Sequence, residues 1–410
     1  MNASIPAWVS LAALALLSGP VKSSQAGNMS TAWDATLYAH GTALDLRGDS
    51  VLNPGNALAR LPGHTSVAEA RFNLKAETDS LRLTLRPLLI ARSHPAGGQP
   101  GQEAYISQGQ VRWRLGEAWS LAAGREVLNW GPAQFRSPSS PFYFDNGRST
   151  PLAELSGVDD VKLSWTPDTD HSLALAYLVG DGHDGHDGHD TRDLQGSGVL
   201  YGEQRGEDWA AGLALVKTPG QGLFAGLHGR YTYSDALLFY AEAASSTRAD
   251  ALVSPSDASQ PFRLEARSPR RSTLLLGTAY TLENGQTLNL EWLHDGHGYS
   301  ARQMDAYFDR AAASPALAGL ALGYALPLLG RDYLHLVWQS NLMDTGGYWR
   351  LMLTRSLTDQ DTELAGYGEY ALSDQASLFG QGALNLGTAR QSLSGLYRSS
   401  VTIGLKLALP

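Results

Sequence analysis

The chain has 410 residues, with 31 Lys and Arg against 40 Asp and Glu, which gives a formal net charge of −9. That balance argues against nucleic acid as a partner, because such proteins neutralise phosphates with an excess of basic residues. The chain has no cysteine, which excludes disulfide frameworks, cysteine zinc sites and thiol catalysis. The high content of Gly (44), Tyr (17) and Trp (10) indicates β structure.

The N-terminus carries an apolar stretch at residues 7–17, followed by a small-x-small pattern at Ser24-Gln25-Ala26. This order of segments predicts a secretory signal peptide over residues 1–26. The stretch of about 11 residues is shorter than the roughly 20 that a transmembrane helix needs. Residues 27–410 would then form the mature domain, with a retained anchor or a buried helix as the alternative for the N-terminus.

Beyond residue 33 the dominant pattern is alternation of apolar and polar residues, which is typical of strands. Leu81, Leu83 and Leu85, for example, alternate with Arg82, Thr84 and Arg86. We expect 18 strands rather than 16, of about the 9–11 residues that a tilted strand needs to cross a bilayer. The candidates span 33–47, 65–78, 81–92, 104–115, 118–130, 157–166, 171–179, 196–204, 208–217, 222–233, 236–247, 272–282, 286–296, 331–343, 347–357, 362–372, 376–387 and 393–409.

The connections between these strands alternate in length. Many are very short, such as Asp79-Ser80 and Gly116-Glu117, whereas others are long: 48–64, 131–156, 180–195, 248–271 and 297–330. Short turns at one end and long loops at the other are typical of an all-β, antiparallel transmembrane barrel with extracellular loops. An extra strand at 315–327 would make the count odd, so we assign 297–330 to one loop containing a short helix over 302–313.

Two segments resemble known barrels. The last strand alternates from Tyr397 through Val401 to Leu409 and resembles the terminal strand that the barrel-insertion machinery reads. Residues 123–132 are similar to a "Gly-Arg-x-x-x-x-Trp-Gly" strand end. The mature chain therefore resembles Gram-negative outer-membrane barrels of the porin and substrate-specific channel type, including the alginate-export class. The resemblance implies an outer-membrane location, contact with outer-membrane lipid and lipopolysaccharide, and a small hydrophilic solute as cargo.

Charged residues on the strands are candidates for the pore lining. A Lys or Arg facing lipid at the bilayer midplane costs about 2–4 kcal/mol, so charged strand residues are expected to face the lumen. A basic wall facing an acidic wall would orient charged solutes, and clustered Arg favours carboxylates or phosphates. The alternative is that these residues pair with one another and fill a closed lumen. The basic candidates are Arg82, Arg86, Arg112, Arg114 and Lys162, and the acidic ones are Glu242, Glu291 and Glu369.

The long segment 131–156 is rich in Pro and aromatic residues. Pro fixes the backbone and aromatic rings need burial, so this loop is expected to be packed rather than free. We predict that it folds into the barrel mouth as a constriction and places Arg136, Asp145 and Arg148 along the path. The alternative is a cap packed on the outer rim.

Residues 181–190 contain three tandem Gly-His-Asp triplets. Imidazole and carboxylate ligands together suit zinc, copper or nickel, and glycine lets a loop wrap around an ion. A triplet repeat also arises without function and stays solvated. The repeat therefore suggests a divalent metal as a cofactor. Its candidate ligands are His183, Asp184, His186, Asp187, His189 and Asp190.

Enzymatic motifs such as Gly-x-Ser-x-Gly, His-Glu-x-x-His or a Walker loop are absent from the sequence, so no enzymatic activity is expected. We expect an outer-membrane channel for passive or facilitated passage of a hydrophilic solute, either anionic or an oligosaccharide. The main alternative is a non-conducting surface or assembly protein. A metal-capturing loop and a barrel-borne hydrolase that uses strand histidines are less favoured alternatives.

Overall fold

The computed structural model describes residues 29–95, 101–143, 147–148, 152–180, 194–341 and 346–409. The predicted signal peptide, Asp145 and all six candidate metal ligands of the Gly-His-Asp repeat lie outside these residues. Within the described part of the chain, no helix has the length and apolar character needed to cross a membrane.

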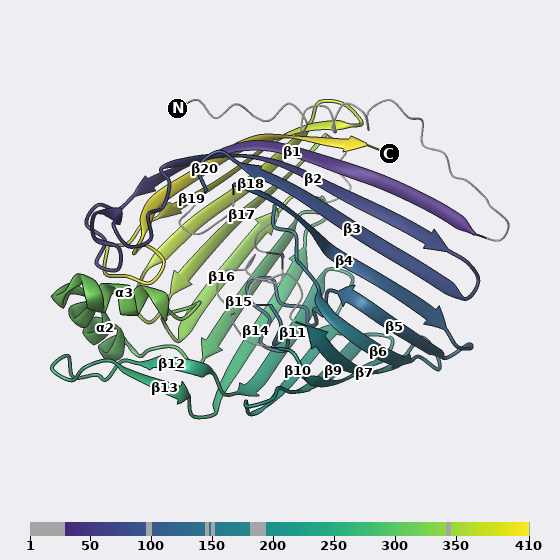
Figure 1. Cartoon of the computed structure of the whole chain (residues 1–410), viewed down its shortest axis with the longest axis horizontal. Helices are drawn as coiled ribbons and strands as arrows, with labels where there is room; N and C mark the ends of the chain where they lie inside the picture. The colour runs from purple at the N-terminus through teal and green to yellow at the C-terminus, as the bar shows by residue number, and fades with distance from the viewer. Residues whose placement is uncertain are drawn as a thin grey trace.

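Eighteen strands form one antiparallel sheet that closes on itself. Each strand pairs with the next, and β1 also pairs with β20, which closes the barrel (Figure 1). The predicted strand number of 18 is confirmed. The strands are β1 (Ser30–Leu46), β2 (His64–Glu77), β3 (Leu81–Arg92), β4 (Gln102–Arg114), β5 (Trp119–Glu126), β6 (Val158–Trp165), β7 (His171–Gly180), β8 (Gly198–Arg205), β9 (Trp209–Lys217), β10 (Leu223–Thr232), β11 (Leu237–Ser246), β14 (Arg271–Thr281), β15 (Thr287–Asp295), β16 (Asp332–Gln339), β17 (Gly347–Ser356), β18 (Thr362–Ala371), β19 (Ala376–Asn385) and β20 (Tyr397–Leu409).

The two ends of the barrel differ as predicted. The end that we call the short-turn end carries tight connections such as 78–80, 115–118 and 206–208. The opposite end, the long-loop end, carries the connections 47–63, 127–157 and 296–331 among others. In Figure 1 the short turns of β1–β6 lie at the right, and the long loops with their helices lie at the left.

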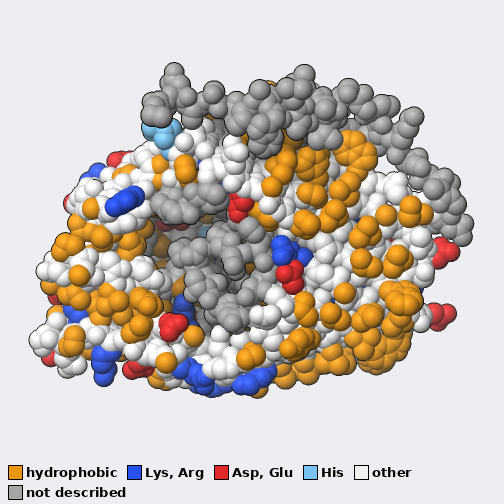
Figure 2. Space-filling model, viewed as in Figure 1, with side chains coloured by type: hydrophobic (Ala, Val, Ile, Leu, Met, Phe, Trp, Pro, Cys, Tyr) orange, Lys and Arg blue, Asp and Glu red, His pale blue; other side chains and the backbone are white. Residues whose placement is uncertain are grey.

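The outer face of the barrel is apolar because the strand alternation puts hydrophobic side chains outward. Leu175, Leu227 and Ile403 are between 52% and 61% exposed, whereas inward positions on the same sheet include buried carboxylates. Figure 2 shows hydrophobic side chains over much of the right-hand surface. An outward apolar band around a polar interior is the arrangement that a barrel in lipid requires.

The long-loop end holds structure that the alternation did not indicate. The predicted helix over 302–313 is confirmed as α2 (Ala301–Ala313), and it is followed by a second helix, α3 (Pro315–Gly323), where a loop was expected. Segment 248–271 contains a hairpin of β12 (Ala249–Val253) and β13 (Arg263–Arg267). A short 3-10 turn, η1, spans Pro54–Asn56.

Two strand ends were predicted four residues too late. Strand β16 ends at Gln339 rather than at residue 343, and strand β5 ends at Glu126 rather than at residue 130. The chain after Glu126 leaves the sheet because Leu128 packs with Phe142 and Leu178 in a buried cluster. Burial of this apolar segment is therefore more favourable than continued pairing with the neighbouring strand.

The helices of the long-loop end pack on a small core of their own. Tyr299, Met304, Tyr307 and Phe308 are buried there together with Leu52 from another loop. The Tyr307 hydroxyl donates to the Ala321 carbonyl at 2.7 Å, and Tyr299 donates to the Leu252 carbonyl at 2.6 Å. Burial raises the pKa of both tyrosines, so both hydroxyls stay protonated as donors. The Tyr307 bond joins α2 to α3, and the Tyr299 bond joins the segment just before α2 to the β12–β13 hairpin.

Arg310 on α2 organises the tip of that hairpin. Its guanidinium donates to Ser254 Oγ at 2.8 Å and to the Pro255 carbonyl at 2.6 Å, and it also bonds the carbonyls of Asp257 and Gln260. The side chain is buried, so the guanidinium takes the place of water at these four acceptors. The Asp257 carbonyl also accepts from the Gln260 N–H within the loop.

We expect Arg310→Ala to loosen residues 254–260 without opening the barrel. Hydrogen bonds to charged groups contribute about 1.5–3 kcal/mol each, so the loop should lose several kcal/mol of local stability. Hydrogen exchange of this loop should become markedly faster, whereas Arg302→Ala, at an exposed position of the same helix, should leave it unchanged. Equal protection in both variants would contradict the assigned role of Arg310.

Candidate functional site: the barrel lumen

A long connection between β5 and β6 enters the barrel. We call residues 127–157 the inner loop, of which 127–143, 147–148 and 152–157 are described. Its first part packs on the inward side chains of neighbouring strands: Phe142 and Leu128 cluster with Leu178 of β7 and Val216 of β9. Phe135 lies further across, in a second buried cluster with Leu275 and Tyr333. The inner loop therefore spans from the β7–β9 wall to the β14–β16 wall.

Glu242 of β11 holds one stretch of the inner loop. One carboxylate oxygen accepts from the Ala133 N–H at 2.8 Å. The other accepts from the hydroxyls of Ser137 at 2.6 Å and Ser139 at 2.8 Å, and from the Ser139 N–H at 3.1 Å. Glu242 is 1% exposed, so its charge is balanced by these four donors instead of water.

Glu291 of β15 holds the adjoining stretch in the same way. Its oxygens accept from the N–H groups of Gln134 at 2.6 Å and Phe135 at 2.8 Å. The Tyr240 hydroxyl donates to the same carboxylate at 2.7 Å. The Tyr240 ring lies over Gly277, and a Cβ added at Gly277 would lie 2.2 Å from a carbon of that ring. Two buried glutamates thus bind consecutive N–H groups of the inner loop.

Gly131 allows the close approach of the inner loop to Glu242. Its φ is +86°, and an added Cβ would lie 2.3 Å from Glu242 Oε1. We expect Gly131→Ala to displace the inner loop, both because the backbone conformation favours glycine and because the carboxylate occupies the space. Limited proteolysis of the detergent-solubilised protein should then cut the loop faster. Gly319→Ala, in open space on α3, should have no effect; protection of the loop in both would count against this role for Gly131.

The two described arginines that sequence analysis placed on the inner loop have different surroundings. Arg148 donates to the carbonyls of Gly131 at 3.0 Å and Ala133 at 2.7 Å, which closes the loop on itself. Arg136 lies over the Phe135 ring, with 4.9 Å from its guanidinium carbon to the ring centroid. The Phe135 ring also stacks with that of His335, with 4.6 Å between the ring centroids. Arg136 therefore belongs to the β16 side of the lumen, and Arg148 supports the loop backbone.

The far end of the inner loop has anchors that sequence analysis missed. Arg71 of β2 donates to the Leu152 carbonyl at 2.5 Å and pairs with Glu154 at 3.3 Å. Ser107 of β4 also reaches Glu154, at 3.4 Å. Arg71 lies in a strand with alternating apolar and polar residues, as Arg82 does. Alternation therefore predicts that the Arg71 side chain faces inward, but it does not predict the contact with Glu154.

Three of the predicted basic residues share one row across the lumen wall. In the strand register Arg82 pairs with Arg112, Arg112 with Ala122, and Ala122 with Lys162. Lys162 forms an ion pair with Glu126, whose other oxygen lies 3.8 Å from Arg112. Arg82 pairs with Glu77 at 2.7 Å, yet its side chain is 51% exposed, and that of Arg112 is 43% exposed.

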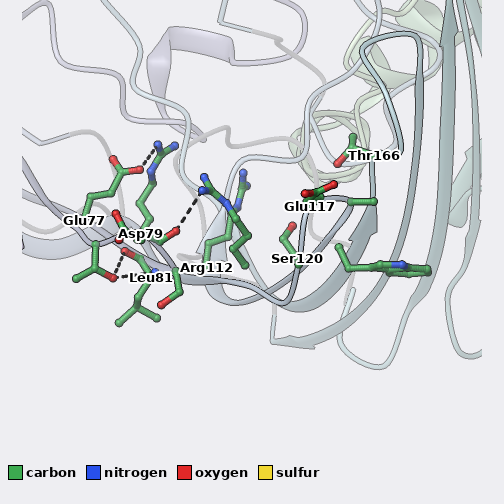
Figure 3. Close-up of a pocket in the computed structure, with 14 residues that line it drawn as sticks. Glu77, Asp79, Leu81, Arg112, Glu117, Ser120 and Thr166 are labelled. Atoms are coloured by element: carbon green, nitrogen blue, oxygen red, sulfur yellow. Dashed lines mark hydrogen bonds and ion pairs between the residues drawn. The ribbon is translucent and has the colours of Figure 1, made fainter. Parts of the chain in front are cut away.

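A pocket at the short-turn end contains both exposed arginines. It has a volume of about 180 Å³ and is also lined by Arg114 and Ser120. Figure 3 shows Arg112 at its centre, with Glu77 and Asp79 to one side and Glu117 and Ser120 to the other. The arginines of β3 and β4 therefore meet solvent where the lumen opens at the short-turn end.

The remaining predicted residues lie in separate places. Arg114 donates to the Asp79 carbonyl at 3.1 Å in a short turn, and Arg86 lies further along β3, partly buried. Glu369 of β18 accepts from Lys406 at 3.0 Å and from Tyr367 at 2.8 Å. The three predicted acidic residues are thus not one accessible wall: Glu242 and Glu291 lie beneath the inner loop, and Glu369 pairs with a lysine.

A second cavity lies behind the inner loop. It has a volume of about 280 Å³ and joins Arg112 and Lys162 to Trp130 and Tyr201. Trp130 stacks on Tyr201 with ring centroids 4.7 Å apart and an interplanar angle of 7°. This cavity combines cationic groups, hydroxyl groups and aromatic edges along one side of the lumen.

The described residues contain no group of three or more His, Asp or Glu side chains arranged to hold a metal ion. The predicted metal ligands of the Gly-His-Asp repeat are not among these residues, so that hypothesis stays a prediction.

Comparison with known proteins gives a structural likeness only. No protein-family model matches the chain, and no curated protein matches its sequence. The solved structure of OccAB1 from Acinetobacter baumannii matches with a TM-score of 0.60 at 10% identity, covering 95% of this chain and 99% of that one. OccK11 (OpdR) from Pseudomonas aeruginosa matches with a TM-score of 0.56 at 12% identity, covering 93% and 96%. At these identities the likeness shows the fold, and the chain therefore shares the barrel fold of these two proteins.

Proposed function

We propose that the protein is an outer-membrane channel of a Gram-negative bacterium, through which a small hydrophilic solute passes passively or with facilitation. The observation that carries this proposal is the inner loop, held inside a closed barrel by buried Glu242 and Glu291. A barrel with a loop fixed across its lumen has a narrowed interior of defined shape, and selection by a channel depends on such a constriction.

The solute that this lumen suits best is anionic, such as a carboxylate or an acidic oligosaccharide. Burial of Glu242 and Glu291 removes two negative charges from contact with water in the lumen. Arg82 and Arg112 remain accessible at the short-turn end. Exposed guanidinium groups attract anions and can bind carboxylates with paired hydrogen bonds.

A non-conducting barrel is the second candidate function, and ion pairing across the lumen wall favours it. Lys162 pairs with Glu126, Lys406 with Glu369, and Arg71 with Glu154. Ion-paired side chains can close a lumen as well as line an open one. This candidate predicts a surface or assembly role with no ion flow.

Conductance in a planar bilayer separates the two candidates. Purified protein, shown to be folded by its heat-dependent gel mobility, would be inserted and its reversal potential measured in a salt gradient. Stable single-channel steps with anion selectivity are the expected result. Block by organic acids, but not by neutral sugars, would support the solute class. A folded, inserted protein that stays silent would contradict conduction and favour the closed barrel.

A further inference from the structure

Strand β6 carries a buried carboxyl group, that of Asp160, for which the fold provides no hydrogen-bond donor. Asp160 is 0% exposed, and within the described part of the chain neither of its carboxyl oxygens accepts a hydrogen bond from a donor group. Asp361, which is also 0% exposed, differs: its carboxylate accepts from the Thr362 N–H and from both the N–H and the hydroxyl of Ser394. A buried carboxylate without such donors is costly, so a group in the position of Asp160 avoids the charge by keeping its proton.

A second carboxyl group lies beside that of Asp160. The Glu126 carboxyl is within hydrogen-bonding reach of it, because Glu126 ends β5 and Asp160 pairs with Gly124 of the same strand. Two ionised carboxylates in contact repel each other, and one proton shared between them removes the repulsion. The protonated Asp160 carboxyl then donates to Glu126, so that the buried proton also has an acceptor.

The two carboxyl groups lie where the ends of the inner loop meet. Glu126 directly precedes this loop, and Gly157, its last residue, packs on the Glu126 backbone: a Cβ added to Gly157 would lie 2.6 Å from the Glu126 carbonyl carbon. Leu178 of β7 is opposite Asp160 in the register and is buried together with Leu128 of the inner loop. Backbone and apolar side chains therefore keep water away from the two carboxyl groups.

Two cations and one separate ion pair complete the charged surroundings. Lys162 of β6 pairs with one oxygen of Glu126, and Arg112 Nη2 of β4 lies 3.8 Å from the other oxygen. The charge of Asp159, also on β6, is balanced by Arg125 at 2.7 Å. With the shared proton in place, two cations therefore face a single carboxylate charge.

This excess of positive charge reaches the space that a solute would occupy. The Arg112 side chain is 43% exposed. It lines both the pocket at the short-turn end (Figure 3) and the cavity behind the inner loop, where Lys162 joins it. Loss of the shared proton would add a second negative charge beside these two cations and cancel the excess. The protonation state of the two carboxyl groups therefore changes how strongly this part of the lumen attracts anions.

We propose that Asp160 and Glu126 share one proton and that this proton sustains the preference of the lumen for anions, which a rise in pH abolishes. Asp160 acts through the charge of the neighbouring Arg112 and Lys162, without contacting the solute. The inference deepens the proposed function, on which the effect on selectivity rests, whereas the shared proton itself does not depend on conduction.

Infrared spectroscopy of the full-length protein in detergent tests the shared proton, because it detects the C=O stretch of a protonated carboxyl group. The test variant Asp160→Asn keeps the shape of the side chain and can still donate to Glu126, but it holds no titratable proton. The control variant Glu369→Gln removes a lumen carboxylate that pairs with Lys406 at 3.0 Å. Heat-dependent gel mobility establishes that each barrel is folded.

At about pH 7, where ordinary carboxyl groups have lost their protons, the wild type should show a band of a protonated carboxyl group. This band should persist in Glu369→Gln, be lost in Asp160→Asn, and fade in the wild type as the pH rises. A wild type without the band, or a test variant that keeps all of it, would overturn the shared proton.

Reversal potentials in a salt gradient test the effect on selectivity. Between about pH 7 and about pH 9, above the ordinary range of carboxyl groups and histidine, the anion-to-cation permeability ratio of the wild type should fall. We expect a change of about twofold or more, since one unit charge is added close to two cations. Glu369→Gln should show the same fall, and Asp160→Asn should keep its ratio. Equal pH dependence of wild type and test variant would overturn the role of Asp160 in selectivity.

The two measurements keep this inference distinct from the proposed function. A silent wild-type protein that shows the carboxyl band would overturn conduction, and with it the effect on selectivity, but would leave the shared proton standing. A conducting channel that lacks the band would overturn this inference and leave the proposed function standing.

Discussion

Replacing Glu242 and Glu291 together with alanine should raise the single-channel conductance and make the open current noisier. The two carboxylates accept from Ala133, Gln134 and Phe135 of the inner loop. Removing them leaves buried N–H groups without an acceptor, at a cost of about 1–3 kcal/mol for each group. The loop can avoid this cost only by moving toward water, which widens the lumen.

Three further variants sharpen this test. Glu291→Gln keeps the shape and one acceptor oxygen, so its conductance should lie between that of the wild type and that of the double variant. Glu283→Ala, in an exposed short turn, should conduct like the wild type. Glu369→Ala removes an acidic residue that does not touch the inner loop in the described contacts and should leave the noise unchanged. A double variant with wild-type current would show that the loop stays in place without these anchors.

Removing the positive charge of Arg82 and Arg112 should reduce anion selectivity. Two unit charges 4 Å apart in water interact by about 1 kcal/mol, and more where the dielectric constant is lower. Loss of both side chains as Arg82→Ala/Arg112→Ala should therefore change the anion-to-cation permeability ratio by about fivefold or more. Reversal potentials in a salt gradient measure this ratio directly.

The matched control for charge is Arg302→Ala/Arg390→Ala, which removes two positive charges at exposed positions of the long-loop end. Its reversal potential should stay within the scatter of the wild type. The change in permeability ratio caused by Arg82→Ala/Arg112→Ala should also shrink at high salt, since exposed charges are screened over about 10 Å at 0.1 M. An unchanged reversal potential for the Arg82/Arg112 variant would contradict an anion path along these strands.

The sequence predicts the barrel wall well because the wall depends on local alternation. Leu81, Leu83 and their neighbours repeat every second residue, and this period holds wherever one face meets lipid and the other a polar lumen. The strand number, the two unlike ends and helix α2 all follow from such local signals. Helix α3 does not, because its residues are almost all small or apolar and carry no alternation that would distinguish helix from strand.

The interior depends on contacts between distant parts of the chain. Alternation correctly assigns an inward side chain to Glu242, but its burial depends on Ser137 and Ser139, more than a hundred residues earlier. No local pattern indicates that a loop will cover one glutamate and leave an arginine exposed. The strand positions of the acidic candidates could therefore be predicted from the sequence. Their exposure to the lumen could not, because it depends on where the inner loop lies.

The seam between β1 and β20 has a kinetic consequence. Ala35 pairs with Leu409, and Leu46 pairs with Tyr397, so the contacts that close the barrel join strands from the two ends of the sheet's sequence order. Contacts of such large sequence separation form slowly. Until β20 docks, the sheet has two unpaired edges, on β1 and on β19, that can template the pairing of other chains. Newly made protein is therefore most prone to aggregate just before closure, and shielding these two edges is what an assembly factor for this barrel would have to do.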